Sequence, residues 1–461
     1  MNSHDDKSMR KPALWISALS SFLTPFLGSS LNVALPSIGH EFNLTAVALT
    51  WIPTAYILSN VVFLVPFGRL ADIKGRKKIF TIGIWIDVIA CIVATMTPSG
   101  PFFILLRAFQ GLGGAMIFST GIAILTSVYP VEERGKVLGI NVASVYSGLS
   151  LGPVIGGFLT HNFGWRSIFF ANIAIGVVII YLVTAKLKGE WEEAKGERYD
   201  WQGNILYSLA FILFMMGFSA VGSTSGYLSL GAGVAAMVGF ISRELKISHP
   251  ILDLRLFRIK PFAFSNLAAL INYCATAALG FLLSLYLQDI KSFNPQHAGL
   301  ILLSQPVIMA LLSPYAGRLS DRIEPRIVAS LGMAFTTIGL LIFCFLDEST
   351  QLGIVLAGLV LLGIGFALFS SPNTNAIMSS VEKRFYGTAS GLVGTMRLTG
   401  MLLGLGVATL AFRYYLGNQS IEPETYPLFL KAVRAAFTLF TLLCFVGIFA
   451  SLARGKIRNS P

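Results

Sequence analysis

Three charged side chains, Asp87, Arg107 and Arg397, stand inside long apolar runs, where a charge needs a partner, water or a function. A charge at the centre of a membrane helix costs at least about 2.5–3.5 kcal/mol on insertion scales. Asp87 and Arg107 flank a turn near residues 98–99 at similar distances, so a rise of about 1.5 Å per residue places them at nearly the same depth. We therefore predict an Asp87–Arg107 pair whose candidate chemistry is proton coupling. The alternative is that Asp87 only pins helices together.

Apolar runs fill the rest of the chain. Its 461 residues are 54% hydrophobic and only 12% charged, whereas a soluble domain carries about 25% charged residues. A membrane helix needs roughly 20 apolar residues, and helices satisfy every backbone donor within their own segment. We predict fourteen membrane helices: 14–37, 47–68, 79–97, 102–128, 137–160, 166–187, 202–221, 227–243, 262–288, 297–317, 326–346, 352–371, 387–412 and 434–453. The run 227–243 is the shortest and is rich in glycine.

The basic charge sets the orientation in the membrane. The net charge is +12, and cytoplasmic loops of membrane proteins carry an excess of Lys and Arg. With the N-terminus in the cytoplasm, only five basic residues fall on the outer side: Arg166, Lys291, Arg413, Lys431 and Arg434. We therefore expect a multi-pass protein of the plasma membrane with both termini cytoplasmic, and the charge does not indicate nucleic-acid binding.

The sequence repeats itself at long range. GRLADIKGRKK begins at Gly68, and GRLSDRIEPR begins 249 residues later at Gly317. The glycines at 135, 139, 148 and 152 recur 252 residues later at 387, 391, 400 and 404. Internal symmetry of this kind marks many transporters, which bind substrate at the interface between repeats.

The repeat defines the predicted fold, an all-α polytopic membrane protein. It consists of two pseudo-symmetric six-helix bundles plus two inserted helices. The predicted domains are an N-terminal bundle (1–187), a linker with the two extra helices (188–260) and a C-terminal bundle (261–461).

Enzyme motifs are absent from the sequence. It contains no phosphate-binding Walker loop, no HExxH, no GxSxG and no His/Asp/Glu metal cluster, and its four cysteines form no CxxC pair. We expect no catalytic residue, no metal and no cofactor. A membrane-embedded enzyme or receptor is the least favoured of the three functions considered.

Several segments resemble motifs of the major facilitator superfamily. GRLADIKGRKK is similar to its motif A, the segment 102–115 (FFILLRAFQGLGGA) to motif B, and 147–157 (SGLSLGPVIGG) to motif C. LNVALPSI (31–38), YDWQG (199–203) and HPILDLRLFRIKPF (249–262) resemble hallmarks of its fourteen-helix drug:proton antiporter branch.

The resemblance implies a conformational gate at the two GRLxD loops. Asp72 would lie beside the start of the thirteenth helix near Gly387, where the helix dipole stabilises an anion by roughly 0.3–1 kcal/mol. Asp321 would mirror it near Gly135. The gate residues are Gly68, Arg69, Asp72, Arg76, Gly317, Arg318 and Asp321. An ordinary positively charged loop is the alternative.

Motif C implies a hinge in the fifth helix, where small residues let helices approach closely and a proline bends the backbone. The hinge residues are Gly148, Gly152, Pro153, Gly156 and Gly157. Motif B implies that Arg107 lines the cavity and responds to the proton or the substrate.

One position departs from the antiporter branch. Leu27 stands where the first helix usually carries an acid, which weakens the usual form of proton antiport and disfavours a cationic substrate. The candidate cavity residues are Asn32, Tyr56, Gln110, Asn141, Tyr146, Asn272, Gln305, Asn373, Asn375 and Arg397. Each of the uncharged ones has an alternative role in joining helices.

Together these features predict a secondary active transporter that exports hydrophobic or amphipathic small molecules by alternating access, as in multidrug efflux, with proton coupling. The alternative is an exporter or uncoupled facilitator of one endogenous metabolite or lipid-like compound. The expected partners of the monomer are a small-molecule substrate, protons and membrane lipids, without nucleic acid.

Overall fold

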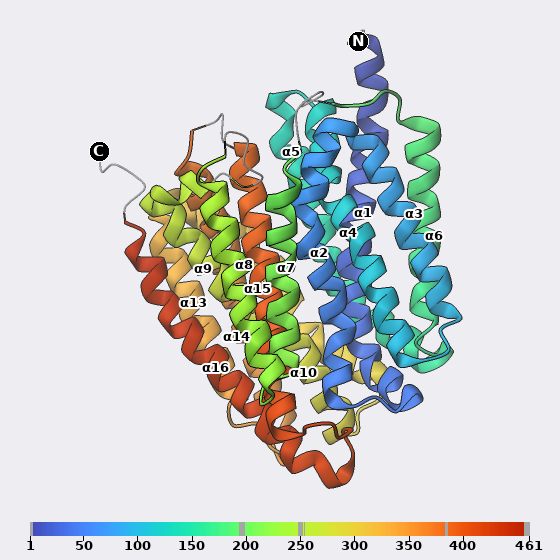
Figure 1. The fold of residues 1–461 in the computed structure, drawn as a ribbon, viewed down its shortest axis with the longest axis vertical. Coiled ribbons are helices and arrows are strands. Elements are labelled where there is room, and N and C mark those ends of the chain that lie inside the picture. Colours follow the sequence, from blue (N-terminus) through green and yellow to red (C-terminus); the bar gives the residue numbers. More distant parts are fainter. Residues whose placement is uncertain (1–2, 193–198, 248–251, 253, 383–385, 456–461) are drawn as a thin grey trace. The chain divides into compact units, whose positions relative to one another are not determined.

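The structure, a computed structural model, describes residues 3–192, 199–247, 252, 254–382 and 386–455. In these ranges the chain forms helices joined by turns and loops, with no strand (Figure 1). The α-helices are α1 (Ser3–Phe42), α2 (Ala46–Lys74), α3 (Arg76–Thr95), α4 (Gly100–Val128), α5 (Val131–Phe163), α6 (Ser167–Lys186), α7 (Trp201–Ser219), α8 (Thr224–Glu244), α9 (Lys260–Ala277), α10 (Leu279–Leu285), α11 (Pro295–Leu302), α12 (Ser304–Arg322), α13 (Pro325–Phe343), α14 (Leu352–Ser379), α15 (Tyr386–Tyr415) and α16 (Tyr426–Ala453). Short turns of helix are η1 (Leu254–Arg258), η2 (Tyr286–Ile290) and η4 (Pro423–Thr425).

The described helices provide 14 candidate membrane spans, which confirms the predicted number. The glycine-rich run 227–243 is one of them, α8. Two spans are interrupted: α9, α10 and η2 together form Lys260–Ile290, and α11 with α12 forms Pro295–Ser320. Pro306 explains the second interruption, because it has no N–H to donate to the carbonyl of Leu302.

The chain divides into two compact units. Unit 1 comprises Met1–Phe42, Trp51–Ser208 and Asn294–Leu300, and unit 2 comprises Asn43–Thr50, Leu209–Phe293 and Ile301–Pro461. The beginning of α11 therefore belongs with unit 1, and the beginning of α2 with unit 2. The domain boundaries at residues 187 and 260 stay a prediction.

Each unit uses the same helix pairings. In unit 1, α1 packs against α4, α5 and α6, and α3 packs against α4 and α6. In unit 2, α9 packs against α14, α15 and α16, and α13 packs against α14 and α16. The second set repeats the first when α9 replaces α1 and α13 to α16 replace α3 to α6. The duplicated sequence therefore gives duplicated packing.

Repeated glycines make the equivalent contacts. A Cβ atom on Gly113 would lie 2.8 Å from the carbonyl oxygen of Gly83, and one on Gly365 would lie 2.7 Å from the carbonyl oxygen of Gly332. A side chain at either position would push the paired helices apart. The first contact joins α3 to α4, and the second joins α13 to α14.

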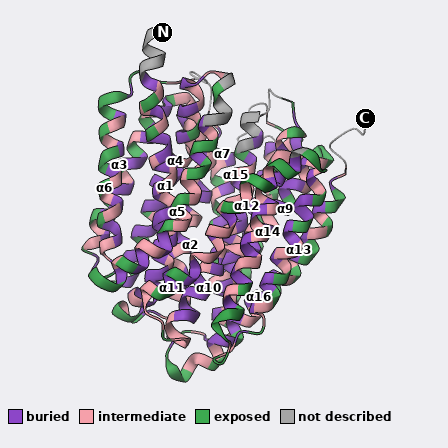
Figure 2. Cartoon of the chain, turned by 180° about the vertical axis from the view of Figure 1, so that it is seen from behind, coloured by how far each residue is buried: buried purple, intermediate pink, exposed green. Residues whose placement is uncertain are grey.

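The faces of α3 show how one helix serves both lipid and core. Its exposed stripe is apolar and includes Trp85, Ile89 and Ile92, as expected for contact with lipid. Its buried stripe carries Asp87 and Cys91 one helical turn apart. Figure 2 shows exposed and buried positions alternating along α3 and α6. The helical period therefore places Asp87, the only carboxylate in α3, on the buried face of the helix, in the interior of unit 1.

Candidate functional site

A buried polar network in unit 1 surrounds Arg107. This arginine of α4 is 3% exposed. Its guanidinium stacks over the ring of Tyr56 at 4.4 Å from the centroid, donates to the side-chain oxygen of Gln110, and reaches the carbonyl oxygen of Ile52 at 3.5 Å. Arg107 and Gln110 are three residues apart, so they lie on the same face of α4.

The amide of Gln110 connects Arg107 to Asp87. Its Nε2 donates to Asp87 Oδ1 at 2.9 Å, while its Oε1 accepts from Arg107. Asn172 of α6 donates from Nδ2 to the other carboxylate oxygen at 3.0 Å. Both amides also reach the sulfur of Cys91, at 3.1 and 3.2 Å. Asp87 thus ties α3 to α4 and α6 and accepts from both amides.

The predicted Asp87–Arg107 pair is therefore bridged by an amide. No direct ion pair joins the two residues, whose side chains both lie in the described part of unit 1. Sequence reasoning did not identify Asn172 or assign a role to Cys91. The signal for Asn172 was an amide in the middle of the apolar run SIFFANIAIGVV, and the signal for Cys91 was its spacing of four residues from Asp87.

Glycines of the QGLGGA segment bring the network together. A Cβ atom on Gly111 would lie 2.8 Å from Ser59 Cβ, and one on Gly114 would lie 2.6 Å from the hydroxyl oxygen of Tyr56. Any larger residue would separate α4 from α2, since both contacts are with α2 residues. The spacing of small residues therefore places Tyr56 against Arg107.

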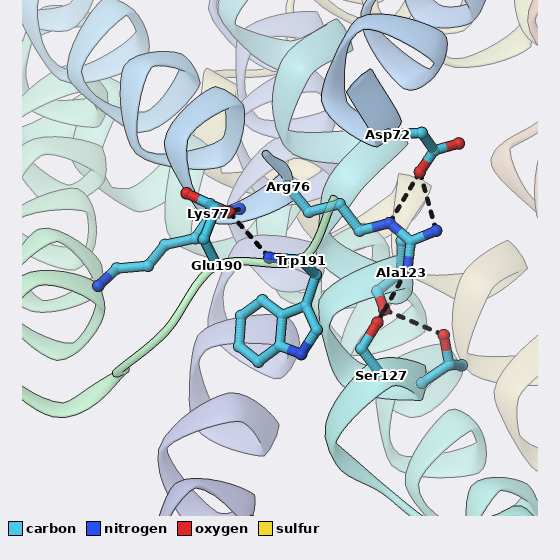
Figure 3. A network of polar contacts seen from close by, with 8 residues as sticks. Asp72, Arg76, Lys77, Ala123, Ser127, Glu190 and Trp191 are labelled. Atoms are coloured by element: carbon cyan, nitrogen blue, oxygen red, sulfur yellow. Dashed lines mark hydrogen bonds and ion pairs between the residues drawn. The ribbon is translucent and has the colours of Figure 1, made fainter. Parts of the chain in front are cut away.

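The first GRLxD loop forms a second network at the end of α2 (Figure 3). Arg76 donates from Nε to Asp72 Oδ1 at 2.9 Å and from Nη1 to Ser127 Oγ at 2.8 Å. Ser127 in turn donates to the carbonyl oxygen of Ala123 at 2.8 Å. These contacts tie the turn between α2 and α3 to α4.

The segment after α6 caps the N-terminus of α3. The Glu190 carboxylate accepts the backbone N–H groups of Lys77 at 2.7 Å and Lys78 at 3.1 Å. The N–H of Arg76 donates to the carbonyl oxygen of Trp191 at 3.1 Å. Gly75 makes this approach possible, because its φ is 111° and a Cβ there would lie 2.5 Å from Glu190 Cδ. Glu190, although distant in sequence, thus acts as the N-terminal cap of α3.

Replacing Glu190 with alanine is expected to destabilise the detergent-solubilised protein by about 1 kcal/mol, the usual cost of losing an N-terminal cap. A thermal unfolding curve measures the change. Lys188→Ala is the matched control, because Lys188 is exposed in the same segment. Equal curves for Glu190→Ala and Lys188→Ala would show that the cap does not contribute.

The second GRLxD loop is built differently. Arg318 is exposed, Gly317 faces Ser371, and the position equivalent to Arg76 is Pro325. A copy of the Arg76–Asp72 ion pair is therefore impossible there. The Asp321 side chain lies outside the described residues, as do residues 135 and 387 of the predicted latch apart from their helical backbone. In the first loop, Gly68 faces Ser119 and Arg69 is half-buried.

The motif C glycines pack α5 closely along α1. A Cβ atom on Gly148 would lie 2.5 Å from the carbonyl oxygen of Phe22, and one on Gly156 would lie 2.6 Å from Ser30 Cα. Gly152 lies between them on the same face, because the spacing is four residues. Ser30 donates to the carbonyl oxygen of Gly152 at 2.9 Å. The predicted hinge is thus, in large part, the contact between α1 and α5 within unit 1.

Two other motif C residues face the beginning of α11, which belongs to unit 1. A Cβ atom on Gly157 would lie 2.5 Å from the carbonyl oxygen of Pro295. The carbonyl of Pro153 faces Gly299, where a side chain would clash with it.

Three cavity candidates are bonded across helices. Asn141 donates to the hydroxyl oxygens of Ser17 and Ser21, each at 2.7 Å. Asn373 donates to the carbonyl oxygen of Ser265 at 3.1 Å, and Asn375 reaches Ser320 Oγ at 3.5 Å. These amides join helices, which is the alternative role that their residue type suggested.

Four other candidates, Asn32, Asn272, Gln305 and Arg397, have no hydrogen bond from their side chains to any part of the chain that the structure describes. Asn32, Gln305 and Arg397 are half-buried, whereas Asn272 is fully buried. Neither amide atom of Asn272 has a hydrogen-bond partner among the described residues. Tyr146 is half-buried, and Leu27 is a buried apolar residue of α1.

Fourteen apolar spans with an internal network of buried polar groups define a multi-pass helical membrane protein. The family model of the Major Facilitator Superfamily matches residues 17–245 and 266–460, and the chain belongs to this family. The family comprises transporters.

Relatives cover nearly the whole chain. The protein is 30% identical over 439 residues to the riboflavin transporter RibZ of Clostridioides difficile, covering 94% of this chain and 95% of that one. It is 29% identical over 400 residues to the multidrug resistance protein Stp of Mycobacterium tuberculosis, covering 86% and 74%. The similarity to Stp is consistent with the drug:proton antiporter branch. The fold is similar to that of the human organic anion transporter MFSD10, with a TM-score of 0.66 and 14% identity over 98% of this chain and 100% of that one.

Proposed function

We propose that this transporter exports amphipathic organic molecules across the plasma membrane in exchange for protons. The observation that carries the proposal is the Asp87–Gln110–Arg107 relay, which buries an ionisable carboxyl group next to a fixed cation inside a membrane span. The similarity to Stp supports export. The loops predicted to lie on the same side of the membrane as the N-terminus carry most of the basic residues, which supports cytoplasmic termini. The protein acts as a monomer in this proposal.

Gln110 can couple a proton on Asp87 to the contacts of Arg107. An ionised carboxylate accepts the amide N–H, which leaves the amide oxygen for Arg107. When that carboxylate oxygen, Oδ1 of Asp87, carries a proton, it becomes a donor. The Gln110 amide then has to rotate so that its oxygen faces Asp87. The amide N–H would face the guanidinium after that turn, so Arg107 would lose an acceptor and be released. Proton uptake thus becomes a change in the contact between α4 and α3.

Reconstitution into liposomes with an imposed pH gradient tests the proposal. Uptake of lipophilic cations, anions and neutral compounds is measured, and flux of a transported compound should follow the gradient. In Asp87→Asn, gradient-driven flux is expected to fall to the level of exchange without a gradient, since the amide side chain cannot exchange a proton.

Glu348→Gln is the matched control for that experiment, because it makes the same chemical change at an exposed loop residue. Its gradient-driven flux should equal that of the unaltered protein. Unchanged proton coupling in Asp87→Asn would remove Asp87 from the mechanism. Flux that ignores the gradient in the unaltered protein would make it an uncoupled facilitator.

Transport of riboflavin is the second candidate, favoured by the identity with RibZ over 94% of this chain. The same liposomes distinguish it. Saturable flux of riboflavin, with none of the lipophilic compounds transported, would identify a single-metabolite transporter.

A further inference from the structure

Arg397 has no acidic partner among the residues that the structure describes. It lies in α15 inside the candidate span Gly391–Tyr415, more than one helical turn from either end. Between Lys260 and Ala453, the candidate spans carry acidic residues only near their ends, at Asp289 and Glu424. The Arg397 side chain makes no ion pair or hydrogen bond with any residue that the structure describes. Arginines in membrane spans are costly and mark pathways of substrates or ions.

Helix packing holds this cation over an aromatic ring. The guanidinium carbon of Arg397 lies 5.3 Å from the ring centroid of Tyr273 in α9. Gly400, one turn further along the same face of α15, fixes the approach, because a Cβ there would lie 2.5 Å from the carbonyl oxygen of Leu270 and 3.0 Å from Tyr273 Cβ.

A second aromatic residue fixes the ring itself. Phe366 of α14 packs edge-on against Tyr273, with centroids 5.6 Å apart and an interplanar angle of 74°. Tyr273, Phe366 and Arg397 are all half-buried, so each keeps an open face. Three helices of unit 2 therefore build one site with a cation and two rings.

The corresponding arrangement in unit 1 shows what Arg397 lacks. Arg107 also stacks on a tyrosine, but it donates to Gln110, is linked through it to Asp87, and is fully buried. Among the residues that the structure describes, Arg397 has Tyr273 as its only polar or charged-group contact. Its N–H groups remain available to a ligand that carries acceptor oxygens.

We infer that Arg397, stacked on Tyr273, binds the anionic group of the transported molecule. The substrate class is an amphipathic organic anion, whose carboxylate or similar group pairs with the guanidinium through two N–H donors while its apolar part lies against Tyr273 and Phe366. This inference rests on the proposed function and adds the charge of the substrate to it.

Binding to purified protein in neutral detergent tests the inference without any gradient. The probes are dansylglycine, an amphipathic carboxylate, and dansylglycinamide, its neutral amide of nearly the same shape. The unaltered protein should bind the carboxylate at least about ten-fold more tightly than the amide, as a charge-assisted contact worth roughly 1.4 kcal/mol requires. Fluorescence enhancement of the dansyl group reports both affinities.

Variants assign the preference to this site. In Arg397→Gln the preference for the carboxylate should disappear while the affinity for the amide stays, which also shows that the variant is folded. Arg397→Lys should keep part of the preference, because it keeps the charge but loses the fork of donors. Tyr273→Leu should weaken both probes by removing the ring.

Three results would overturn the inference: equal affinities in the unaltered protein, no binding of either probe, or a preference that survives Arg397→Gln. Displacement of the carboxylate by phosphatidylglycerol at a membrane-like mole fraction would assign Arg397 to a lipid headgroup and would also overturn it. The two experiments separate this inference from the proposed function, because proton-driven flux can be absent while the preference for the carboxylate is present, and the preference can be absent while proton-driven flux is present.

Discussion

Asp87→Leu is expected to destabilise the protein by about 3–5 kcal/mol, the cost of removing one partner of a buried charged pair. The variant leaves Arg107 buried and positively charged, and a guanidinium cannot lose its proton to escape. It also deprives the amides of Gln110 and Asn172 of their carboxylate acceptor. Thermal or denaturant unfolding of the solubilised protein measures the loss.

The double variant Asp87→Leu/Arg107→Leu distinguishes charge from packing. Stability should return most of the way, because well-packed apolar replacements of a buried pair are often neutral. Arg107→Leu alone should cost less than Asp87→Leu, since the remaining carboxyl group can take up a proton. A double variant no more stable than Asp87→Leu would mean that the two charges do not interact through Gln110.

Gly152→Leu is expected to destabilise the protein by about 3 kcal/mol or more, at or above the upper end for overpacking. A Cβ at this position would lie 2.9 Å from the carbonyl oxygen of Phe26 and would also clash with the Ser29 hydroxyl. The carbonyl belongs to the backbone of α1, so it cannot rotate away as a side chain could. The expected result is a lower melting temperature and a loss of monodisperse protein on size-exclusion chromatography.

Gly139→Leu is the control on the same helix. No atom of the described residues lies within 4 Å of a Cβ at Gly139, which is exposed. Leucine favours a helix over glycine by up to about 1 kcal/mol. Its stability should equal or exceed that of the unaltered protein. A comparable loss in both variants would indicate that leucine disturbs α5 in general and that the contact with α1 is unimportant.

The sequence determined the helices and their number because each membrane span needs a long apolar run of its own. Even the glycine-rich run 227–243 forms a span. The repeat could also be recognised from the sequence, since Gly148 and Gly400 recur at a fixed offset, and Gly148 packs against α1 as Gly400 packs against the equivalent helix α9. The sequence did not show where a membrane span is interrupted by an irregular turn, as at Leu303 between α11 and α12.

Which side chains contact Asp87 and Arg107 in the buried polar network was decided by the tertiary structure. The depths of Asp87 and Arg107 followed from counting residues along a hairpin, and the structure does bring them near each other. The amide between them did not follow, because Gln110 could have pointed to any neighbouring helix. Asn172 joined the network from α6, whose rotation about its axis is set by packing rather than by its own residues.

Two polar residues of membrane helices show the same difference between what the sequence and the tertiary structure decide. Asn141 and Arg397 are both polar groups in an apolar helix, yet the amide nitrogen of Asn141 donates to two serines of α1, while among the described residues the Arg397 side chain contacts only the ring of Tyr273 as a polar partner. Residue type fixes what a side chain can donate or accept. Whether those donors and acceptors are already satisfied depends on which helix faces them, and that is decided only when glycines and ridges lock the helices together.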